Sequence, residues 1–583
     1  MSDEQGGSYH PGVTDVEVAS EIPSGTKDRF TDVEVRRDLM VEMSDGVHLF
    51  ADVYLPQGAR KVPAILTRHP YGKNEEFMGM ASIGEYLARK GYAFVCQDVR
   101  GRFASEGTFD SPFGRHEIQD GFDTIEWIVE QDWSNSTVGM WGESYYGFTS
   151  YCGAISGHRA LKCIAPGDPT SFELYDFIYR QGAFPLNAVG TWAMAMDSKR
   201  YNPFDGLDYW ALPLTAIPDR MGQLGAMYKR WVTRPERDDS QWRNGDLTDC
   251  FGKIAVPTLL WGGWYDNIQG PWMADWQKIL VQSPAPEHKH LMVGPWDHEG
   301  ISNFTGVVGP LVVGKNLAYR WDTIQAFFDH YMMGEDNGFD RRSRVEIFVM
   351  GDNTWRFEES WPLTRAIDTD FYLRSDGRLG LAQPGDAGSD SFVYDSAHPV
   401  TDTLGSDLWA AIDFLDDRRA TEARDDVLVY TSEALEEDME ITGNVRAELH
   451  AASSAVDTDF TVTLVDVFED GYAHQIQHGI IRASYRDPMT KPSPIEPGRV
   501  YAYPIDLWST SYVVKRGHRI RIEVSSSRFN EFDRNLNSGE TQGEGVNPVA
   551  ATQTIYRSAD HPSRIILPIV PRSSPAAFPA REG

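Results

Sequence analysis

Residues 138–154 constrain the fold most narrowly, because they read as a strand, a sharp turn and a helix in immediate succession. The apolar run Val138–Trp141 leads into the hexapeptide Gly142–Gly147, and a segment of small residues follows. A serine at such a turn, here Ser144, projects clear of both flanking elements, so its hydroxyl can reach a substrate. The pattern G-x-S-x-G is only partly met, because the second glycine comes one residue late. An ordinary turn rich in Gly and Ser is therefore the alternative interpretation.

Apolar stretches alternate with helical patterns over residues 47–331, which predicts a parallel sheet with helices on both faces. Strands are expected at 47–55, 62–67, 92–98, 138–141, 254–261 and 290–293, and helices at 83–90, 123–130 and 317–331. In such sheets, sites form at the carboxyl ends of the strands. His69–Tyr71, Asp98–Arg102 and Ser144 all lie at predicted strand ends.

Two further regions differ in texture from this sheet. Residues 172–249 are rich in aromatic residues and methionine, which predicts a helical insertion that could also cap a pocket over Ser144. Short alternating stretches after residue 365 predict a β-sandwich or jelly roll. The expected fold class is α/β, and the expected divisions are a polar lead-in (1–35), the two parts of the sheet domain (36–171 and 250–365), the helical cap (172–249) and the jelly roll (366–583).

Bulk composition excludes several classes of function. The 583 residues carry a formal net charge of −32, and phosphate binding needs a basic face, so nucleic acid is not an expected partner. No apolar run reaches about 18 residues, and the polar N-terminus lacks the features of a secretory signal. A cytoplasmic protein without membrane contact is therefore expected. The four cysteines have neither CxxC nor zinc-ligand spacing. Buried free thiols and no metal site are expected.

Three residues at predicted strand ends stand in the order that acyl transfer by serine requires. The serine needs a base to take its proton and a carboxylate to hold that base in the right tautomer. Ser144, Asp266 and His298 follow in this order, each after an apolar strand and in a turn that contains glycine. Each has a simpler alternative. Asp266 could cap its own turn, Asp297 is a rival carboxylate, and a loop histidine is usually only solvated.

A developing oxyanion needs two hydrogen-bond donors. The first predicted donor is the backbone N–H of Tyr145, and the second is the phenol of Tyr71 at another strand end. The alternative for Tyr71 is a loop side chain stacked on Pro70. The charged segment Asp98–Arg102 could bind phosphate, but buried charges are normally paired, so we favour a buried Asp–Arg pair that holds the loop.

The combination of these motifs resembles the cocaine esterase / X-prolyl dipeptidyl-peptidase family, which also includes α-amino-acid ester hydrolases and cephalosporin acylases. The elbow of that family has the form G-x-S-Y-x-G, which accounts for the late glycine. Further matching segments lie throughout the chain after residue 35, at 69–71, 97–102, 263–266, 294–298, 454–460, 524–529 and 532–535. The resemblance implies an α/β-hydrolase domain, an inserted helical cap and a C-terminal jelly roll.

The same resemblance assigns roles to individual residues. It implies Ser144 as the nucleophile, His298 as the base, Asp266 as the residue that orients it and Tyr71 as the side-chain oxyanion donor. Aromatic residues of the cap and jelly roll line the acyl pocket in this family, and by position they correspond to Tyr179, Trp192 and Trp409.

One departure from the family bears on the substrate. The amino-acid ester hydrolases carry acidic residues just after the catalytic Asp, where they bind the substrate ammonium. Ile268 and Gln269 stand at those positions in this chain, which argues against that activity.

The expected protein is a cofactor-free serine hydrolase that cleaves carboxylic esters, or amides, of small molecules through an acyl-enzyme. An X-prolyl dipeptidyl-peptidase or a cephalosporin-type acylase is the alternative among enzymes. A carbohydrate-binding protein on an inactive hydrolase scaffold is the alternative from another class, and the intact order of the triad argues against it. Members of the family suggest a homo-oligomer, which the acidic composition neither supports nor opposes.

Overall fold

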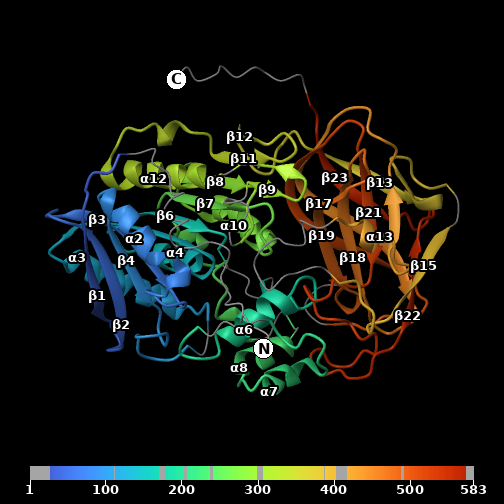
Figure 1. The fold of residues 1–583 in the computed structure, drawn as a ribbon, viewed down its shortest axis with the longest axis horizontal. Helices are drawn as coiled ribbons and strands as arrows, with labels where there is room; N and C mark the ends of the chain where they lie inside the picture. Colours follow the sequence, from blue (N-terminus) through green and yellow to red (C-terminus); the bar gives the residue numbers. More distant parts are fainter. Residues whose placement is uncertain are drawn as a thin grey trace, which may run out of the picture.

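Two large β-sheets dominate the computed structural model, and a helical insertion lies beside both of them (Figure 1). The structure describes residues 27–109, 112–169, 177–201, 206–234, 236, 240–298, 306–314, 316–385, 388–401, 417–486 and 492–572. The insertion carries α6 (Thr191–Ala195), α7 (Ile217–Arg220), α8 (Ala226–Val232) and α9 (Ser240–Arg243). The insertion is helical, as predicted, but each of these helices has only four to seven residues.

The first sheet has ten strands and is parallel through its centre. Its order is β1-β2-β4-β3-β5-β6-β7-β8-β11-β12, in which β1, β2 and β12 run antiparallel to their neighbours. The strands are β1 (Val33–Glu42), β2 (His48–Pro56), β3 (Val62–His69), β4 (Ala93–Asp98), β5 (Ser134–Glu143), β6 (Leu161–Gly167), β7 (Thr258–Gly263), β8 (Lys289–Gly294), β11 (Val345–Val349) and β12 (Thr354–Glu358). Central parallel strands are buried on both faces, which explains why they read as apolar runs.

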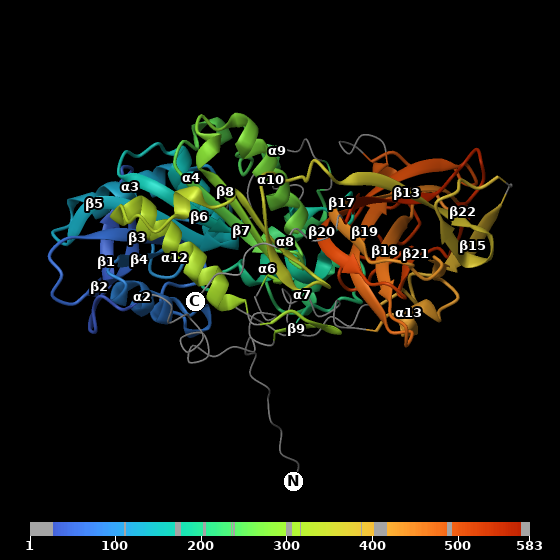
Figure 2. The same ribbon diagram turned by 90° about the horizontal axis from the view of Figure 1, so that it is seen from above.

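Helices cover both faces of this sheet (Figure 2). Alternate side chains of one strand belong to two different hydrophobic clusters: Ile65 lies in the cluster that contains residues of α2 and α12, whereas Leu66 lies in the cluster that contains residues of α3, α4 and α10. The helices are α2 (Met80–Arg89), α3 (His116–Glu130), α4 (Ser144–Ile155), α10 (Gln269–Gln282) and α12 (Leu317–Met333). The four cysteines are buried and free, which confirms the prediction from their spacing.

Some element boundaries differ from the sequence prediction for identifiable reasons. Helix α3 begins seven residues before the predicted 123, because its first turns bury the charged Glu117 and Asp120, which break the apolar pattern. Strand β7 begins at Thr258 and not at Ile254, because the preceding Pro257 has no N–H to donate to a ladder. Strand β1 begins at Val33, inside the range 1–35 that was expected to be a polar lead-in.

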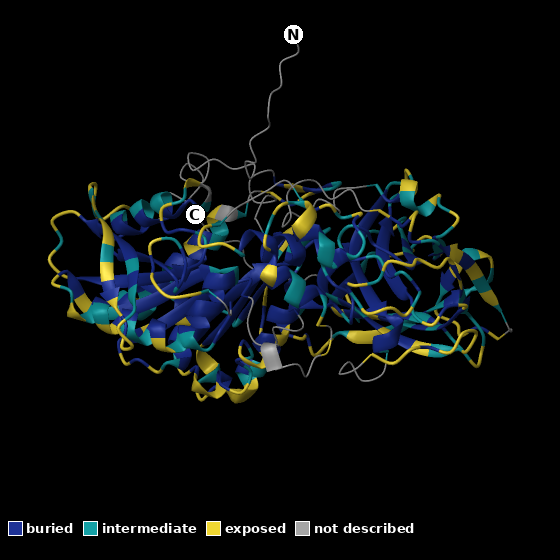
Figure 3. Cartoon of the chain, turned by 90° about the horizontal axis from the view of Figure 1, so that it is seen from below, coloured by how far each residue is buried: buried dark blue, intermediate teal, exposed yellow. Residues whose placement is uncertain are grey.

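The second sheet has eleven strands and is antiparallel except for the pair β14–β16. Its strands are β13 (Ile367–Arg374), β14 (Arg378–Gly380), β15 (Ser389–Tyr394), β16 (Leu428–Thr431), β17 (Met439–Ser453), β18 (Asp459–Val467), β19 (Ala473–Arg482), β20 (Tyr501–Val514), β21 (Arg519–Ser525), β22 (Ala551–Tyr556) and β23 (Arg564–Val570). The short elements β9 (Val307–Val308), β10 (Leu311–Val312) and α13 (Arg419–Glu422) lie outside the two large sheets. Buried strands run through the middle of both large sheets (Figure 3). Within the described ranges, no helix has the length and apolarity needed to cross a membrane.

The C-terminal domain forms hydrogen bonds to the loop at the carboxyl end of β7. The Gln269 side chain, at the start of α10, donates to the Ser509 carbonyl at 2.6 Å and accepts the Ser509 N–H at 3.0 Å. From β19, the Gln477 amide donates to the Trp264 carbonyl at 3.1 Å. These bonds fix the loop between β7 and α10 from outside the α/β domain.

Candidate active site

Ser144 lies at the turn between β5 and α4 with a φ of +53°, a left-handed conformation that non-glycine residues rarely adopt. The flanking glycines are explained by packing. A Cβ on Gly142 would overlap the ring and backbone of Tyr146, and one on Gly147 would lie 2.9 Å from the Gly167 carbonyl oxygen. The second glycine therefore comes three residues after the serine, because that is where the first turn of α4 meets the end of β6.

Asp266 and His298, from the loops after β7 and β8, form a hydrogen-bonded pair. The distance from His298 Nδ1 to Asp266 Oδ1 is 3.0 Å. Oδ1 also accepts the Ile268 N–H at 3.0 Å, and Oδ2 accepts the indole N–H of Trp272 at 2.8 Å. Asp266 thus makes both the Asx-type bond considered from the sequence and the bond to histidine, so the two interpretations are compatible.

Tyr71 lies in the loop after β3, half-buried among aromatic rings. The indole N–H of Trp192 donates to its hydroxyl oxygen at 3.2 Å, and the His69, Tyr146 and Tyr201 rings lie 5.8–6.5 Å from its own ring, centre to centre. The cap thus contacts the predicted oxyanion donor directly through Trp192.

Two buried side chains hold the Tyr71 loop in place. Nδ1 of His69 accepts the Tyr71 N–H at 3.2 Å, and its Nε2 lies 3.2 Å from the Cys96 sulfur. Burial lowers the pKa of His69 to about 3, so this imidazole is neutral. Arg102 donates to the carbonyls of Pro70 at 2.9 Å and Met196 at 3.0 Å, which joins the loop to the cap.

The charged segment after β4 is paired, as expected, but not in the expected way. Asp98 accepts the Lys73 N–H at 2.8 Å and lies 3.8 Å from its ammonium. Arg100 pairs with Asp120 at 2.6 Å and with Asp45 at 2.8 Å. An Asp–Arg pair does hold this segment, as expected, but it joins Arg100 to Asp120 of α3, whereas Asp98 pairs with Lys73.

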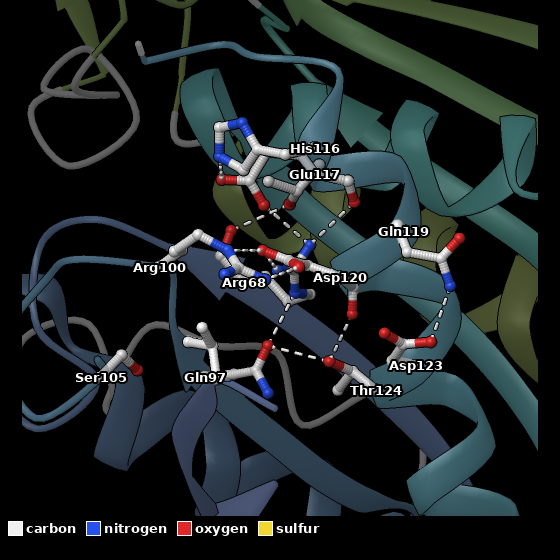
Figure 4. Close-up of polar contacts among 12 residues, drawn as sticks. Arg68, Gln97, Arg100, Ser105, His116, Glu117, Gln119, Asp120, Asp123 and Thr124 are labelled. Carbon is white, nitrogen blue, oxygen red and sulfur yellow. Dashed lines mark hydrogen bonds and ion pairs between the residues drawn. The ribbon is translucent and has the colours of Figure 1, made fainter. Parts of the chain in front are cut away.

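Arg68, Arg100, Glu117 and Asp120 form a largely buried ion-pair network (Figure 4). Arg68 pairs with Glu117 at 2.9 Å, and all atoms of both side chains are buried. Glu117 also accepts the Tyr145 hydroxyl at 3.0 Å. His116, Glu117 and Asp120 come close enough together for a metal site, but the Arg68 guanidinium already supplies the positive charge there. The network joins the strand that precedes Tyr71 to the helix that begins at Ser144.

The three predicted pocket residues have different surroundings. Trp192 is buried, stacks on Trp231 at 5.7 Å and on Phe113 at 5.5 Å, and contacts Tyr71. Tyr179 is buried inside the cap, where its hydroxyl donates to the Trp231 carbonyl. Trp409 lies outside the described residues.

Sequence reasoning missed two residues beside the Asp266–His298 pair. Trp272 gives no sequence signal, because an indole in an apolar helix face reads as core. Asp168 follows β6 directly, with a φ of +37°, and its carboxyl lies within 4.8 Å of Asp266 and His298. The signal that pointed to Ser144 and Asp266, a polar residue at the end of an apolar strand, would also have found Asp168.

Comparison with known proteins places the chain in a family. The family model for X-Pro dipeptidyl-peptidase (S15 family) matches residues 45–300, and the model for the X-Pro dipeptidyl-peptidase C-terminal non-catalytic domain matches residues 337–566. The chain is 36% identical to cocaine esterase from Rhodococcus sp. (strain MB1 Bresler) over 92% of its own length and 99% of that protein.

Solved structures agree with this assignment along nearly the whole chain. An aminopeptidase from the marine sediment archaeon Thaumarchaeota archaeon is 27% identical with a TM-score of 0.83, covering 95% of this chain and 99% of that one. An α-amino acid ester hydrolase is 26% identical with a TM-score of 0.82, covering 94% and 98%. The protein is therefore a hydrolase that belongs to the cocaine esterase / X-Pro dipeptidyl-peptidase (S15) family, with an α/β-hydrolase sheet, an inserted helical region and a C-terminal antiparallel β domain.

Proposed function

We propose that this serine hydrolase cleaves carboxylic esters of small molecules, and amides more slowly, through an acyl-enzyme on Ser144. The observation that carries the proposal is the 3.0 Å contact between His298 Nδ1 and Asp266 Oδ1, at the sheet edge where Ser144 occupies a strained turn. The order of the three residues and the 36% identity to cocaine esterase support it further.

In this mechanism His298 is the general base. Its Nδ1 faces a carboxylate and therefore carries the ring proton, which leaves Nε2 to take the proton of the Ser144 hydroxyl. The serine oxygen attacks the ester carbonyl, and His298 then returns the proton to the leaving alkoxide. Water attacks the acyl-enzyme in a second step with His298 again as base. Asp266 stabilises the imidazolium that forms in each step.

Tyr71 and Tyr145 are the proposed oxyanion donors. The first N–H groups of an α-helix have no partner within the helix, and the N–H of Tyr145 is one of these. A phenol oxygen that accepts one hydrogen bond, as Tyr71 does from Trp192, can still donate its own proton. The helix dipole of α4 adds to the stabilisation of a negative charge at this end.

We infer that a free amine on the substrate is not required. The Gln269 side chain, which stands where amino-acid ester hydrolases place an acidic residue, is buried and bonded to Ser509 in both directions. The aromatic lining around Trp192 favours a bulky or aromatic acyl group, with Tyr179 and Trp409 as further candidates. Dipeptidyl-peptidase activity is the second candidate, because the matching family model carries that name. We also propose domain limits at 171/172, 249/250 and 365/366, and a homo-oligomer as the assembled form. The limit expected at 35/36 would divide β1, so the sheet domain includes Val33.

Active-site labelling tests the proposal directly. A fluorophosphonate reacts only with an activated serine, so wild type should be labelled once, at Ser144, as located by peptide mass spectrometry. Ser144→Ala should take up no label. Labelling at another serine, or none in folded protein, would refute the assignment of the nucleophile.

A further inference from the structure

Three groups that can hold a proton meet where β6, β7 and β8 end. The carboxyl groups of Asp168 and Asp266 and the imidazole of His298 lie within 4.8 Å of one another. Asp168 is 3% exposed and Asp266 is 3% exposed. Gly262 makes room for this arrangement, because a Cβ there would overlap the Asp168 carboxyl and the Trp272 ring.

Two buried carboxyl groups this close cannot both be ionised without a strong penalty, so one of them holds a proton. The other charged groups around Asp168 do not remove this constraint. Glu143, at the end of β5, adds negative charge, and Arg320 of α12 pairs with Glu143 at 3.9 Å. Burial and the Asp266 charge raise the pKa of Asp168 well above its usual range.

The hydrogen bonds decide which carboxyl carries the negative charge. Asp266 accepts from three N–H groups, those of Trp272 at 2.8 Å, Ile268 at 3.0 Å and His298 at 3.0 Å. Asp168 accepts the Gly263 N–H at 3.2 Å. Each donor stabilises an ionised acceptor, so the charge lies on Asp266 and the proton on Asp168.

We propose that Asp168 is a positioning residue which stays protonated and donates a hydrogen bond to Asp266, so that the pair facing His298 carries one negative charge. This inference rests on the proposed function, since it assigns Asp266 to orient the base. The donated bond adds to the three N–H bonds that already hold the Asp266 carboxylate. A single charge matches the single positive charge that the imidazole acquires during each proton transfer.

The test compares Asp168→Asn with Asp168→Ala in pH profiles of kcat/KM for a p-nitrophenyl ester. The amide of Asn keeps a donor toward Asp266 and has no charge, so the midpoint of the acid limb should stay within about 0.3 pH units of wild type. Ala removes the donor to a charged group, which costs roughly tenfold or more in kcat/KM. A midpoint that falls by about one pH unit in Asp168→Asn would show that Asp168 is ionised in wild type. An unchanged kcat/KM in Asp168→Ala would show that Asp168 does not position Asp266. Either result overturns the inference.

A stability measurement serves as a readout independent of turnover. A protonated Asp168 in the folded state, against an ionised one in the unfolded state, makes wild type lose stability as pH rises above about 4. The Tm of Asp168→Asn relative to wild type should therefore rise between about pH 5 and pH 8, and a difference independent of pH would overturn the inference. If Asp168→Asn does not fold, Asp168→Ser, which also keeps a donor without charge, replaces it in both measurements. Ser144→Ala distinguishes failure of this inference from failure of the proposed function. Turnover that survives Ser144→Ala refutes the proposed function, whereas the Asp168 variants alone decide the role of Asp168.

Discussion

The hydrogen bond from Trp192 to Tyr71 gives a quantitative test of the oxyanion site. Removing the Tyr71 hydroxyl in Tyr71→Phe should lower kcat by about 10²–10³-fold, the usual effect of losing one oxyanion donor. Trp192→Phe removes a neutral hydrogen bond of 3.2 Å to the same oxygen. Such a bond contributes about 0.5–1.5 kcal/mol, so kcat should fall roughly 2- to 12-fold.

A double-mutant cycle isolates this contribution. The indole also packs on Trp231 and Phe113, and loss of that packing affects the variant whether or not Tyr71 keeps its hydroxyl. In a Tyr71→Phe background, Trp192→Phe should therefore lose the part of its effect that acts through the hydroxyl, a coupling of about 0.5–1.5 kcal/mol. The assay is kcat with a saturating p-nitrophenyl ester for all four proteins. Equal effects of Trp192→Phe in both backgrounds would refute the reasoning, and would leave Trp192 as a pocket residue only.

Three further changes test the scaffold around the site. Gly147→Ala should destabilise the fold by about 1–3 kcal/mol and displace the start of α4 with loss of kcat, whereas Gly252→Ala, whose added carbon meets only a carbonyl oxygen at 3.5 Å, should change neither. Glu117→Gln leaves the buried Arg68 charge poorly compensated, so urea denaturation should show a free energy of unfolding lower by about 3 kcal/mol. A decrease below about 1 kcal/mol would contradict the stabilising role of this buried ion pair. Burial lowers the pKa of His474 to about 3. Below about pH 6.5 the unfolded state therefore binds a proton that the folded state does not. Wild-type stability should fall there by up to about 1.4 kcal/mol per pH unit. His474→Phe should reduce that slope in urea denaturation at about pH 7 and pH 5, and an equal slope in both proteins would exclude His474 as its source.

Local signals were sufficient to predict six of the ten strands of the first sheet, β2, β3, β4, β5, β7 and β8, but not β1, β6, β11 or β12. Central parallel strands are apolar throughout, and polar residues follow them at the edge where substrates bind, so the pattern points to the residues after β3, β5, β7 and β8. The family resemblance was confirmed by the comparisons, and the helical insertion by the structure. The late glycine at 147 received its physical reason only from the structure, because that reason is a contact with the end of β6.

Buried charges account for most of what the sequence could not give. Glu117 and Asp120 look like the polar face of a helix, and only the position of Arg68 on a neighbouring strand makes their burial favourable. The partners of Asp98 and Arg100, which are Lys73 and Asp120, could not be identified from the sequence for the same reason, since they come from other segments that pack against this one. The hydrogen bonds between Gln269 and Ser509 join residues 240 positions apart.

The central claim is that Ser144 forms an acyl-enzyme with esters, and one measurement tests it most directly. It compares hydrolysis of a p-nitrophenyl ester series with that of Gly-Pro-p-nitroanilide, for wild type and Ser144→Ala. We predict ester turnover that disappears in Ser144→Ala, and no cleavage of the anilide by either protein. Cleavage of the anilide by wild type alone would move the assignment to a dipeptidyl-peptidase, and ester turnover that persists in Ser144→Ala would contradict the account.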